Sequence, residues 1–321
     1  MTWLITGGAG YIGSHVVASA RKAGFSVVVI DDLSTGFADR IPADVPFINA
    51  DIADRDAVAA AIKQHGITGV VHLAAKKQVG ESVEQPFLYW DWNINKMITF
   101  LDVLNANGVT QFVYSSSAAV YGNPADGSTA LTEETECKPL SPYGATKLAG
   151  EVLIESLASI GKLAGISLRY FNVAGAGDPV LADRMAFNLI PIALTLMDNK
   201  RPITVFGTDY PTPDGTCIRD YVHVEDLAEA HVAAMQHLVD GNAGHVRLNI
   251  GTGHGASVLD IVHALEACAG EKVEWSDTGR RAGDPTSVVA NVQRAKSVLG
   301  WQSSRTLNDI VSSAYRAWPK A

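Results

Sequence analysis

A glycine-rich turn near the N-terminus constrains the fold of this chain more than any other feature. The segment Thr6-Gly-Gly-Ala-Gly-Tyr-Ile-Gly13 follows a short apolar run and precedes Tyr11–Lys22, which has helical spacing. Because Gly7, Gly10 and Gly13 lack side chains, the backbone can approach a phosphate group, and the following helix offers N–H donors and a partial positive charge. A turn of this kind between a strand and a helix predicts a dinucleotide-binding βαβ unit.

An acidic residue at the end of the next apolar run defines the cofactor more closely. Asp31 lies 18 positions after Gly13 and follows the β-branched run Ser26–Ile30. A carboxylate there can accept hydrogen bonds from the hydroxyls of an adenosine ribose. It would repel a 2′-phosphate, and Asp32 adds a second negative charge. We therefore expect NAD, and not NADP, as the cofactor.

Strand-like and helix-like segments alternate through the first half of the chain. The further expected strands are Pro46–Asn49, Gly69–Leu73, Gln111–Ser115 and Ile166–Tyr170. The expected helices are Asp54–His65, Pro86–Asn107 and Pro142–Ile160. This alternation predicts a parallel sheet with helices on both faces. The uninterrupted apolar strands agree, since parallel strands are buried on both sides.

The pattern changes after residue 172, where Gly, Pro and Asp become frequent. Helical spacing recurs at roughly 184–199, 224–239, 257–269 and 307–318, among short strands such as Arg247–Ile250. We expect an α/β protein with a Rossmann-type doubly wound parallel sheet and a smaller mixed α/β substrate lobe. The expected boundaries are 1–171, with 220–252 returning to it, for the NAD-binding domain, and 172–219 with 253–321 for the substrate lobe.

Composition excludes several classes of function. The net charge of −9 argues against nucleic-acid binding through bulk electrostatics. The three cysteines are odd in number and scattered, which indicates a reducing compartment. The nine histidines show no metal-ligand spacing, so no metal site is expected. Without a signal peptide or an apolar span, the expected protein has no membrane association and is cytoplasmic.

The segment Tyr143-Gly-Ala-Thr-Lys147 predicts acid–base chemistry. Its i, i+4 spacing puts both side chains on one face of a helix. A nearby ammonium group should lower the pKa of a phenol, which is otherwise too high for a base at neutral pH. Ser115-Ser-Ser117 follows a strand, at the end where open α/β sheets bind ligands. Ser117 could therefore share a substrate proton with Tyr143.

These motifs carry a family resemblance. The chain resembles the extended short-chain dehydrogenase/reductase family in the segments Thr6–Gly13, Ser115–Gly122, Ser141–Lys147 and Arg169–Asn172. It is most similar to the UDP-sugar 4-epimerases of that family in Val79–Ser82, Phe206–Pro211, Asp214–His223 and Arg280–Asp284. The resemblance runs from residue 3 to past residue 301, and 206–223 is its most specific part.

The resemblance implies roles for individual residues. It implies a catalytic triad of Ser117, Tyr143 and Lys147, of which Tyr143 and Lys147 also contact the cofactor. The implied cofactor contacts beyond the glycines are Tyr11, Ile12, Asp31, Asp51, Ile52, Lys77, Asn95 and Phe171. The implied substrate contacts beyond Ser117 and Tyr143 are Asn172, Asn188, Arg219, Arg281, Asp284 and Val288. A planar arginine suits a diphosphate in an acidic protein.

The implied activity is NAD-dependent inversion of C4 of a UDP-hexose, UDP-glucose or UDP-galactose, through a transient 4-keto sugar. Dehydratases of the family carry Thr-Asp-Glu where this chain has Ser117-Ala-Ala119, which argues against loss of water. UDP-uronic acids and UDP-pentoses stay open as substrates. A small Val288 at the implied sugar pocket leaves UDP-N-acetylhexosamines open too. An idle NAD-binding sensor is the alternative from another class.

Two further expectations rest on the resemblance. It implies a homodimer built from the helices expected at 86–107 and 142–160. The segment 174–186 looks short for its implied place over the UDP-sugar.

Overall fold

The structure is a computed structural model that describes residues 1–123, 130–281 and 283–319. Ala282, inside the implicated Arg281–Asp284 segment, lies outside the described residues, as do the last two residues of the expected substrate lobe. Within the described ranges, no helix combines the length and the apolar character that crossing a membrane requires.

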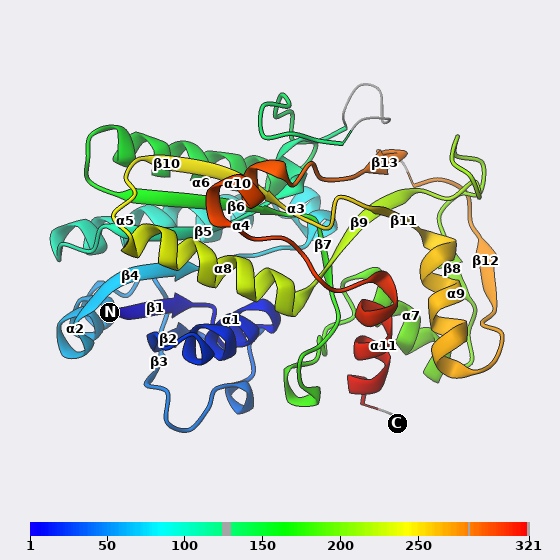
Figure 1. Ribbon diagram of the computed structural model, residues 1–321, viewed down its shortest axis with the longest axis horizontal. Coiled ribbons are helices and arrows are strands. Elements are labelled where there is room, and N and C mark those ends of the chain that lie inside the picture. Colours follow the sequence, from blue (N-terminus) through cyan, green and yellow to red (C-terminus); the bar gives the residue numbers. More distant parts are fainter. Residues whose placement is uncertain (124–129, 282, 320–321) are drawn as a thin grey trace.

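A seven-stranded parallel sheet forms the larger part of the molecule (Figure 1). Its strands in sequence order are β1 (Thr2–Thr6), β2 (Ser26–Asp31), β3 (Phe47–Asn49), β4 (Ile67–His72), β5 (Gln111–Ser117), β6 (Ala164–Tyr170) and β10 (His245–Ile250). They are arranged as β10-β6-β5-β4-β1-β2-β3. The chain starts at β1 in the middle and adds strands first on one side and then on the other. This order opens a ligand crevice at the carboxyl ends of β1 and β4 and confirms the predicted Rossmann-type sheet.

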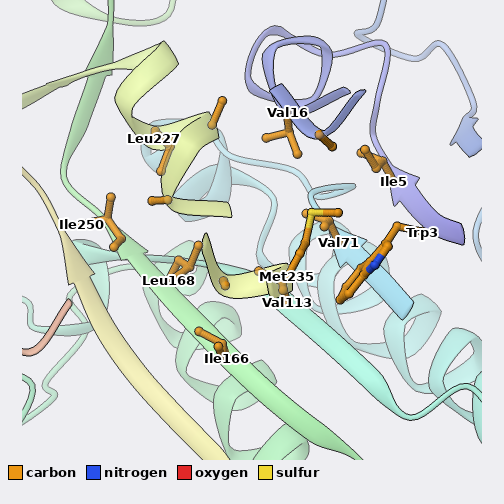
Figure 2. Close-up of a cluster of buried hydrophobic side chains, with 14 of the residues drawn as sticks. Trp3, Ile5, Val16, Val71, Val113, Ile166, Leu168, Leu227, Met235 and Ile250 are labelled. Atoms are coloured by element: carbon orange, nitrogen blue, oxygen red, sulfur yellow. The ribbon is translucent and has the colours of Figure 1, made fainter. Parts of the chain in front are cut away.

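Helices cover both faces of this sheet. The helices α1 (Tyr11–Lys22) and α8 (Val224–Val239) pack on one face, while α2 (Arg55–His65), α5 (Lys96–Ala106) and α6 (Pro142–Ser159) pack on the other. Successive side chains of a strand point to opposite faces. Trp3 and Ile5 accordingly join the core beneath α1 and α8, part of which Figure 2 shows, and Leu4 joins the opposite core. The strands are therefore apolar without interruption.

The single helix expected at 86–107 is broken into several parts. It comprises α4 (Pro86–Trp90), a π-helical turn η2 (Asp91–Asn95) and α5, and a short helix α3 (Val79–Glu84) precedes it. Such turns arise where one extra residue is accommodated in a helix, often near functional sites. Here Asn93 of the turn is buried and bonds the backbone of Lys76.

The second half builds a smaller lobe, at the right of Figure 1. One small sheet joins β7 (Asn172–Ala174), β9 (Ile218–His223), β11 (Gly255–Ser257) and β13 (Ser287–Val288), and β8 (Ile203–Val205) pairs with β12 (Trp275–Asp277). Its core includes residues of α7 (Leu189–Asp198), α9 (Val258–Ala269) and α11 (Leu307–Ala317). The remaining short elements are η1 (Ala38–Arg40), η3 (Ala118–Val120), η4 (Pro179–Leu181) and α10 (Gln293–Leu299).

Two details of this half differ from the expectation. Residues 184–188 are not helical, because α7 begins only after its N-cap residue, Asn188. The helix α10 was not expected, since its seven residues are too few to show a clear helical period.

Candidate functional site

One cavity joins the glycine turn to the Tyr-Lys pair. It lies at the carboxyl ends of the central strands, where the order of the sheet predicts a ligand site. Of the residues implicated by the sequence, Gly7, Gly10, Tyr11, Ile12, Gly13, Asp31, Asp51, Ile52, Lys77, Tyr143 and Lys147 line this cavity.

The glycine turn is packed too closely to accept side chains. Gly7 has a left-handed φ of 69°, and a Cβ there would lie 2.8 Å from the backbone nitrogen of Ala74. A Cβ on Gly13 would lie 2.1 Å from the carbonyl oxygen of Gly7. The first turn of α1 can therefore approach β1 closely, with its N-terminus at the cavity.

Asp31 holds the glycine turn in place from the end of β2. Its carboxylate accepts hydrogen bonds from the backbone N–H of Ala9 at 2.9 Å and of Leu33 at 2.8 Å. Burial raises the pKa of Asp31, and these two hydrogen bonds oppose the rise. Because a carboxylate offers about four acceptor positions, Asp31 keeps capacity for two ribose hydroxyls.

Tyr143 and Lys147 project from the first two turns of α6. The N-cap residue Ser141 starts this helix and accepts the backbone N–H of Gly144 at 3.2 Å. The Lys147 ammonium donates to the carbonyl oxygen of Ser115 at 2.8 Å and lies 5.9 Å from the centre of the Tyr143 ring. Burial lowers the pKa of Lys147 to about 7. The pair thus lies one helical turn apart on α6, as the i, i+4 spacing indicates, and Lys147 contacts the end of β5.

Burial is the main influence on the acidity of Tyr143 in the protein without NAD. Burial raises the pKa of the phenol, and a side-chain hydrogen bond with Ser117 opposes the rise. The expectation that Lys147 and the positive ring of NAD together lower this pKa concerns the enzyme with bound cofactor, and it stays a prediction. Without the cofactor, the Lys147 ammonium donates to a carbonyl group, and desolvation of the phenol prevails.

A buried ion pair that sequence reasoning missed supports this arrangement. Arg169 of β6 donates to both carboxylate oxygens of Glu151, at 2.9 and 2.6 Å, and the same carboxylate accepts from the Ser116 hydroxyl at 2.5 Å. Because Glu151 lies one turn after Lys147, the pair ties α6 to the ends of β5 and β6. The i+4 position of Glu151 after Lys147 places both on one helix face, but no local pattern indicates Arg169 as the partner of Glu151.

Two of the implied cofactor residues do not line the cavity. Asn95 is exposed and bonds Asp91 at 3.2 Å, whereas Asn93, two positions earlier, is buried. The Asn93 side chain bonds the Lys76 backbone in both directions, because the π-helical turn directs it inward. Phe171 is buried in a separate apolar cluster with Val120, Tyr121, Leu131 and Ala290.

The implied substrate residues gather around β9. Arg219 donates to the carbonyl oxygens of Ile218 and Pro285, both at 2.8 Å, and its second nitrogen lies 3.8 Å from a carboxylate oxygen of Asp284. Val288 pairs with Arg219 in the β13–β9 ladder. The exposed Asn172 stands opposite Tyr221 in the β7–β9 ladder.

Two other implied substrate residues are exposed and contact segments other than β9. Arg281 is exposed, and its guanidinium carbon is 4.0 Å from the centre of the Phe206 ring. Asn188, also exposed, donates to Asp183 at 3.3 Å, and Asp183 itself lines the cofactor cavity.

The remaining residues that line the cavity belong to no motif that can be recognised in the sequence. They come from separate segments of the chain and include Arg40, Lys76, Trp92, Lys96, Asp183, Met185 and Phe187. Within the described chain, no three His, Cys, Asp or Glu side chains are grouped so that they could hold a metal ion.

The chain is similar to a known protein family and to several proteins and solved structures. Residues 3–251 match the model of the NAD-dependent epimerase/dehydratase family. The chain is 43% identical to the UDP-glucose 4-epimerase of Azospirillum brasilense, over 99% of this chain and 92% of that protein. It is 42% identical to the enzyme of that name from Corynebacterium glutamicum, over 98% and 95% of the two chains. It superposes with a TM-score of 0.94 on a Stenotrophomonas maltophila UDP-glucose 4-epimerase with bound NAD and formylated UDP-arabinopyranose, at 39% identity over 99% and 97% of the two chains.

Proposed function

Because the chain belongs to the NAD-dependent epimerase/dehydratase family, we propose that it inverts C4 of a UDP-hexose and interconverts UDP-glucose and UDP-galactose. One observation carries the proposal: a single cavity brings the glycine turn and Asp31 together with Tyr143 and Lys147. A site that only bound a dinucleotide would not require a buried lysine beside a phenol at the end of β5.

The cavity fits NAD. Gly7 and Gly13 leave no room for side chains, so the N–H groups of the turn can receive the pyrophosphate, and Asp31 retains acceptors for the adenosine ribose. The proposed further contacts are Tyr11, Ile12, Asp51, Ile52, Lys77, Tyr143 and Lys147. These residues would hold NAD, which would supply reversible hydride transfer and a positively charged ring that would favour the Tyr143 phenolate.

Tyr143 is the proposed base and acid of the reaction. Its phenolate takes the proton of the sugar 4-hydroxyl and later gives it back to the keto oxygen. The Ser117 hydroxyl forms a hydrogen bond with the same sugar oxygen and orients it toward Tyr143. Lys147 uses one of its N–H groups on the Ser115 carbonyl, which leaves two N–H donors and its charge for the cavity. The result is a reversible proton transfer with no net redox change.

The residues around β9 are the proposed anchor for UDP. Arg219 and Arg281 supply the planar cations that a diphosphate requires, with Asn172, Asn188 and Asp284 as the polar neighbours. Inversion at C4 requires that the hexose presents its opposite face for the return of the hydride. Most of the binding free energy must therefore come from the uridine and the phosphates.

The small size of Val288 is compatible with a second class of substrate. This side chain is half-buried against the cluster that contains Val120, Tyr121 and Phe171. A valine in that position leaves more room than an aromatic residue would, so UDP-N-acetylhexosamine is the alternative hexose. The Stenotrophomonas relative contains a UDP-arabinopyranose derivative, which supports testing a UDP-pentose as well.

We also propose a homodimer in the cytoplasm. The exposed apolar residues Phe87, Ile98 and Val152 lie on α4, α5 and α6, with exposed fractions of 88%, 48% and 52%. Large exposed apolar side chains that gather on one surface are typical of a site that another protein covers. The three free cysteines support a reducing compartment.

Proton NMR of UDP-galactose incubated with the purified protein, without added NAD, tests the proposal. Growth of the UDP-glucose anomeric signal to an equilibrium mixture is the expected result. Parallel samples of UDP-N-acetylglucosamine, a UDP-pentose and a UDP-uronic acid identify the preferred sugar. If no UDP-sugar reacts even after NAD is supplied, the epimerase proposal is wrong and an NAD-binding sensor takes its place.

A further inference from the structure

Two segments that are far apart in sequence meet beside the cofactor cavity. One is the loop after β2, which ends in η1 (Ala38–Arg40), and the other runs from η4 (Pro179–Leu181) to the start of α7. Arg40 of the first segment and Asp183, Met185 and Phe187 of the second all line the cavity. A molecule that fills this cavity therefore contacts both segments.

Two arginines join these segments. Arg40 donates to the carbonyl oxygen of Ala182, and Arg184 donates to the Asp39 carboxylate at 2.9 Å and 3.3 Å. The guanidinium carbons of Arg40 and Arg184 lie 5.0 and 5.1 Å from the centre of the same ring, that of Phe37. Arg184 also donates to the carbonyl oxygen of Val180 at 3.0 Å, which holds its own segment together.

The environment of Arg40 is unusual for an arginine. The residue is only 4% exposed, and within the described chain its Nε has no hydrogen-bond partner. Burial of a charge without full hydrogen bonding reduces stability. A contact that costs stability in this way is often found where function requires it.

We propose that Asp39, Arg40, Ala182 and Arg184 form a clasp that retains NAD in the cavity through repeated turnovers. The proposal rests on the proposed function. The hydride taken from C4 returns to the same sugar, so loss of the cofactor between the two transfers would end the reaction. Release of NAD through this side requires that the 179–187 segment moves from η1, which breaks both arginine contacts at once.

The rate of NAD release from the purified protein tests the clasp. Protein saturated with NAD is diluted into a dehydrogenase and its alcohol substrate, which convert free NAD to a product absorbing at 340 nm. Arg184→Ala removes the ion pair with Asp39 and the bond to Val180, and we expect release roughly tenfold faster than from wild type. Asp39→Ala tests the same contact from the other side, and the double variant should be no faster than the faster single one.

Arg21→Ala is the matched control. Arg21 of α1 forms an ion pair with Asp44, which lies between η1 and β3, and the Arg21 side chain is 36% exposed against 29% for Arg184. Neither Arg21 nor Asp44 lines the cavity. Release from this variant should stay within about twofold of wild type, since an exposed pair contributes little on its own, and thermal unfolding shows whether each variant is folded.

The outcomes separate the two proposals. Wild type that retains NAD while Arg184→Ala and Asp39→Ala release it no faster than Arg21→Ala overturns the clasp alone. Equal acceleration in all three variants also overturns it, because loosening of the loop would then explain the effect. Wild type that binds no NAD overturns the proposed function and the clasp together.

Discussion

At the residue scale, the phenol oxygen of Tyr143 is the atom on which the proposed reaction depends. Tyr143→Phe keeps the ring and its edge contact with Tyr89 but removes the proton acceptor. We expect kcat for UDP-galactose to fall roughly 100- to 10,000-fold with little change in NAD content. Steady-state kinetics and the NAD content of the purified variant measure both.

A chemically identical change elsewhere controls for this result. Tyr210→Phe also removes a buried phenol oxygen, one without a hydrogen-bond partner among the described residues and outside the cavity. Its kcat should match that of wild type. Equal losses in the two variants would contradict the role given to Tyr143.

Burial of Lys147 has a consequence for stability. Its pKa is lowered from 10.5 to about 7, so between these values the unfolded chain binds a proton that the folded chain does not. The free energy of unfolding must then fall as the pH falls from about 10 to 7, by about 1.4 kcal/mol per pH unit, and the loss levels off below 7. Urea unfolding of wild type against Lys147→Met, without cofactor, measures it. If the free energy of unfolding changes with pH equally in the two proteins, the pKa of Lys147 is not shifted.

At the element scale, the junction of β1 and α1 depends on the absence of a single methyl group. An added Cβ at Gly13 would lie 2.1 Å from the Gly7 carbonyl oxygen, so helix and strand must separate. Gly13→Ala should cost about 1–3 kcal/mol of stability and abolish retention of NAD. Gly80→Ala is the control, because a Cβ there meets nothing within 4 Å. Bound NAD and thermal unfolding report the two effects, and retention of NAD by Gly13→Ala would refute the argument.

The π-helical turn η2 shows that a local sequence pattern can be insufficient to predict the shape of a helix. The helix expected at 86–107 is apolar and uninterrupted by proline after Pro86, and nothing in its sequence marks a π-helical turn. The turn is stabilised by contacts of Asn93 with Lys76 and with Thr146 of α6, at 2.8 to 3.0 Å. Asn93 therefore has a structural role that depends on tertiary contacts, and the implied cofactor contact of Asn95 stays a prediction.

At the scale of the whole molecule, the exposed apolar face of α4, α5 and α6 predicts association. Phe87→Glu places a charge at the most exposed of these apolar residues, where burial in a dimer would be costly. We expect light scattering after gel filtration to show a dimer for wild type and a monomer for the variant. Trp275→Glu, on β12 of the smaller lobe and 41% exposed, should leave the mass unchanged. A monomeric wild-type protein would exclude the dimer.

The sequence by itself determined the sheet, the cofactor turn and the Tyr143–Lys147 pair, because each depends on residues close together in the chain. Alternation of strand and helix dictates a parallel sheet, and i, i+4 spacing dictates a shared helix face. The assignment of domain boundaries stays a prediction.

Only the tertiary structure decided which distant segments share the cavity and how its groups titrate. Arg40 meets Ala182, and Glu151 meets Arg169, across separations that no local period encodes. The pKa of Tyr143 followed burial and not its neighbour in the motif. The physical reason is common to all three: hydrogen bonding and desolvation depend on what packs around a group, which the order of residues along the chain does not show.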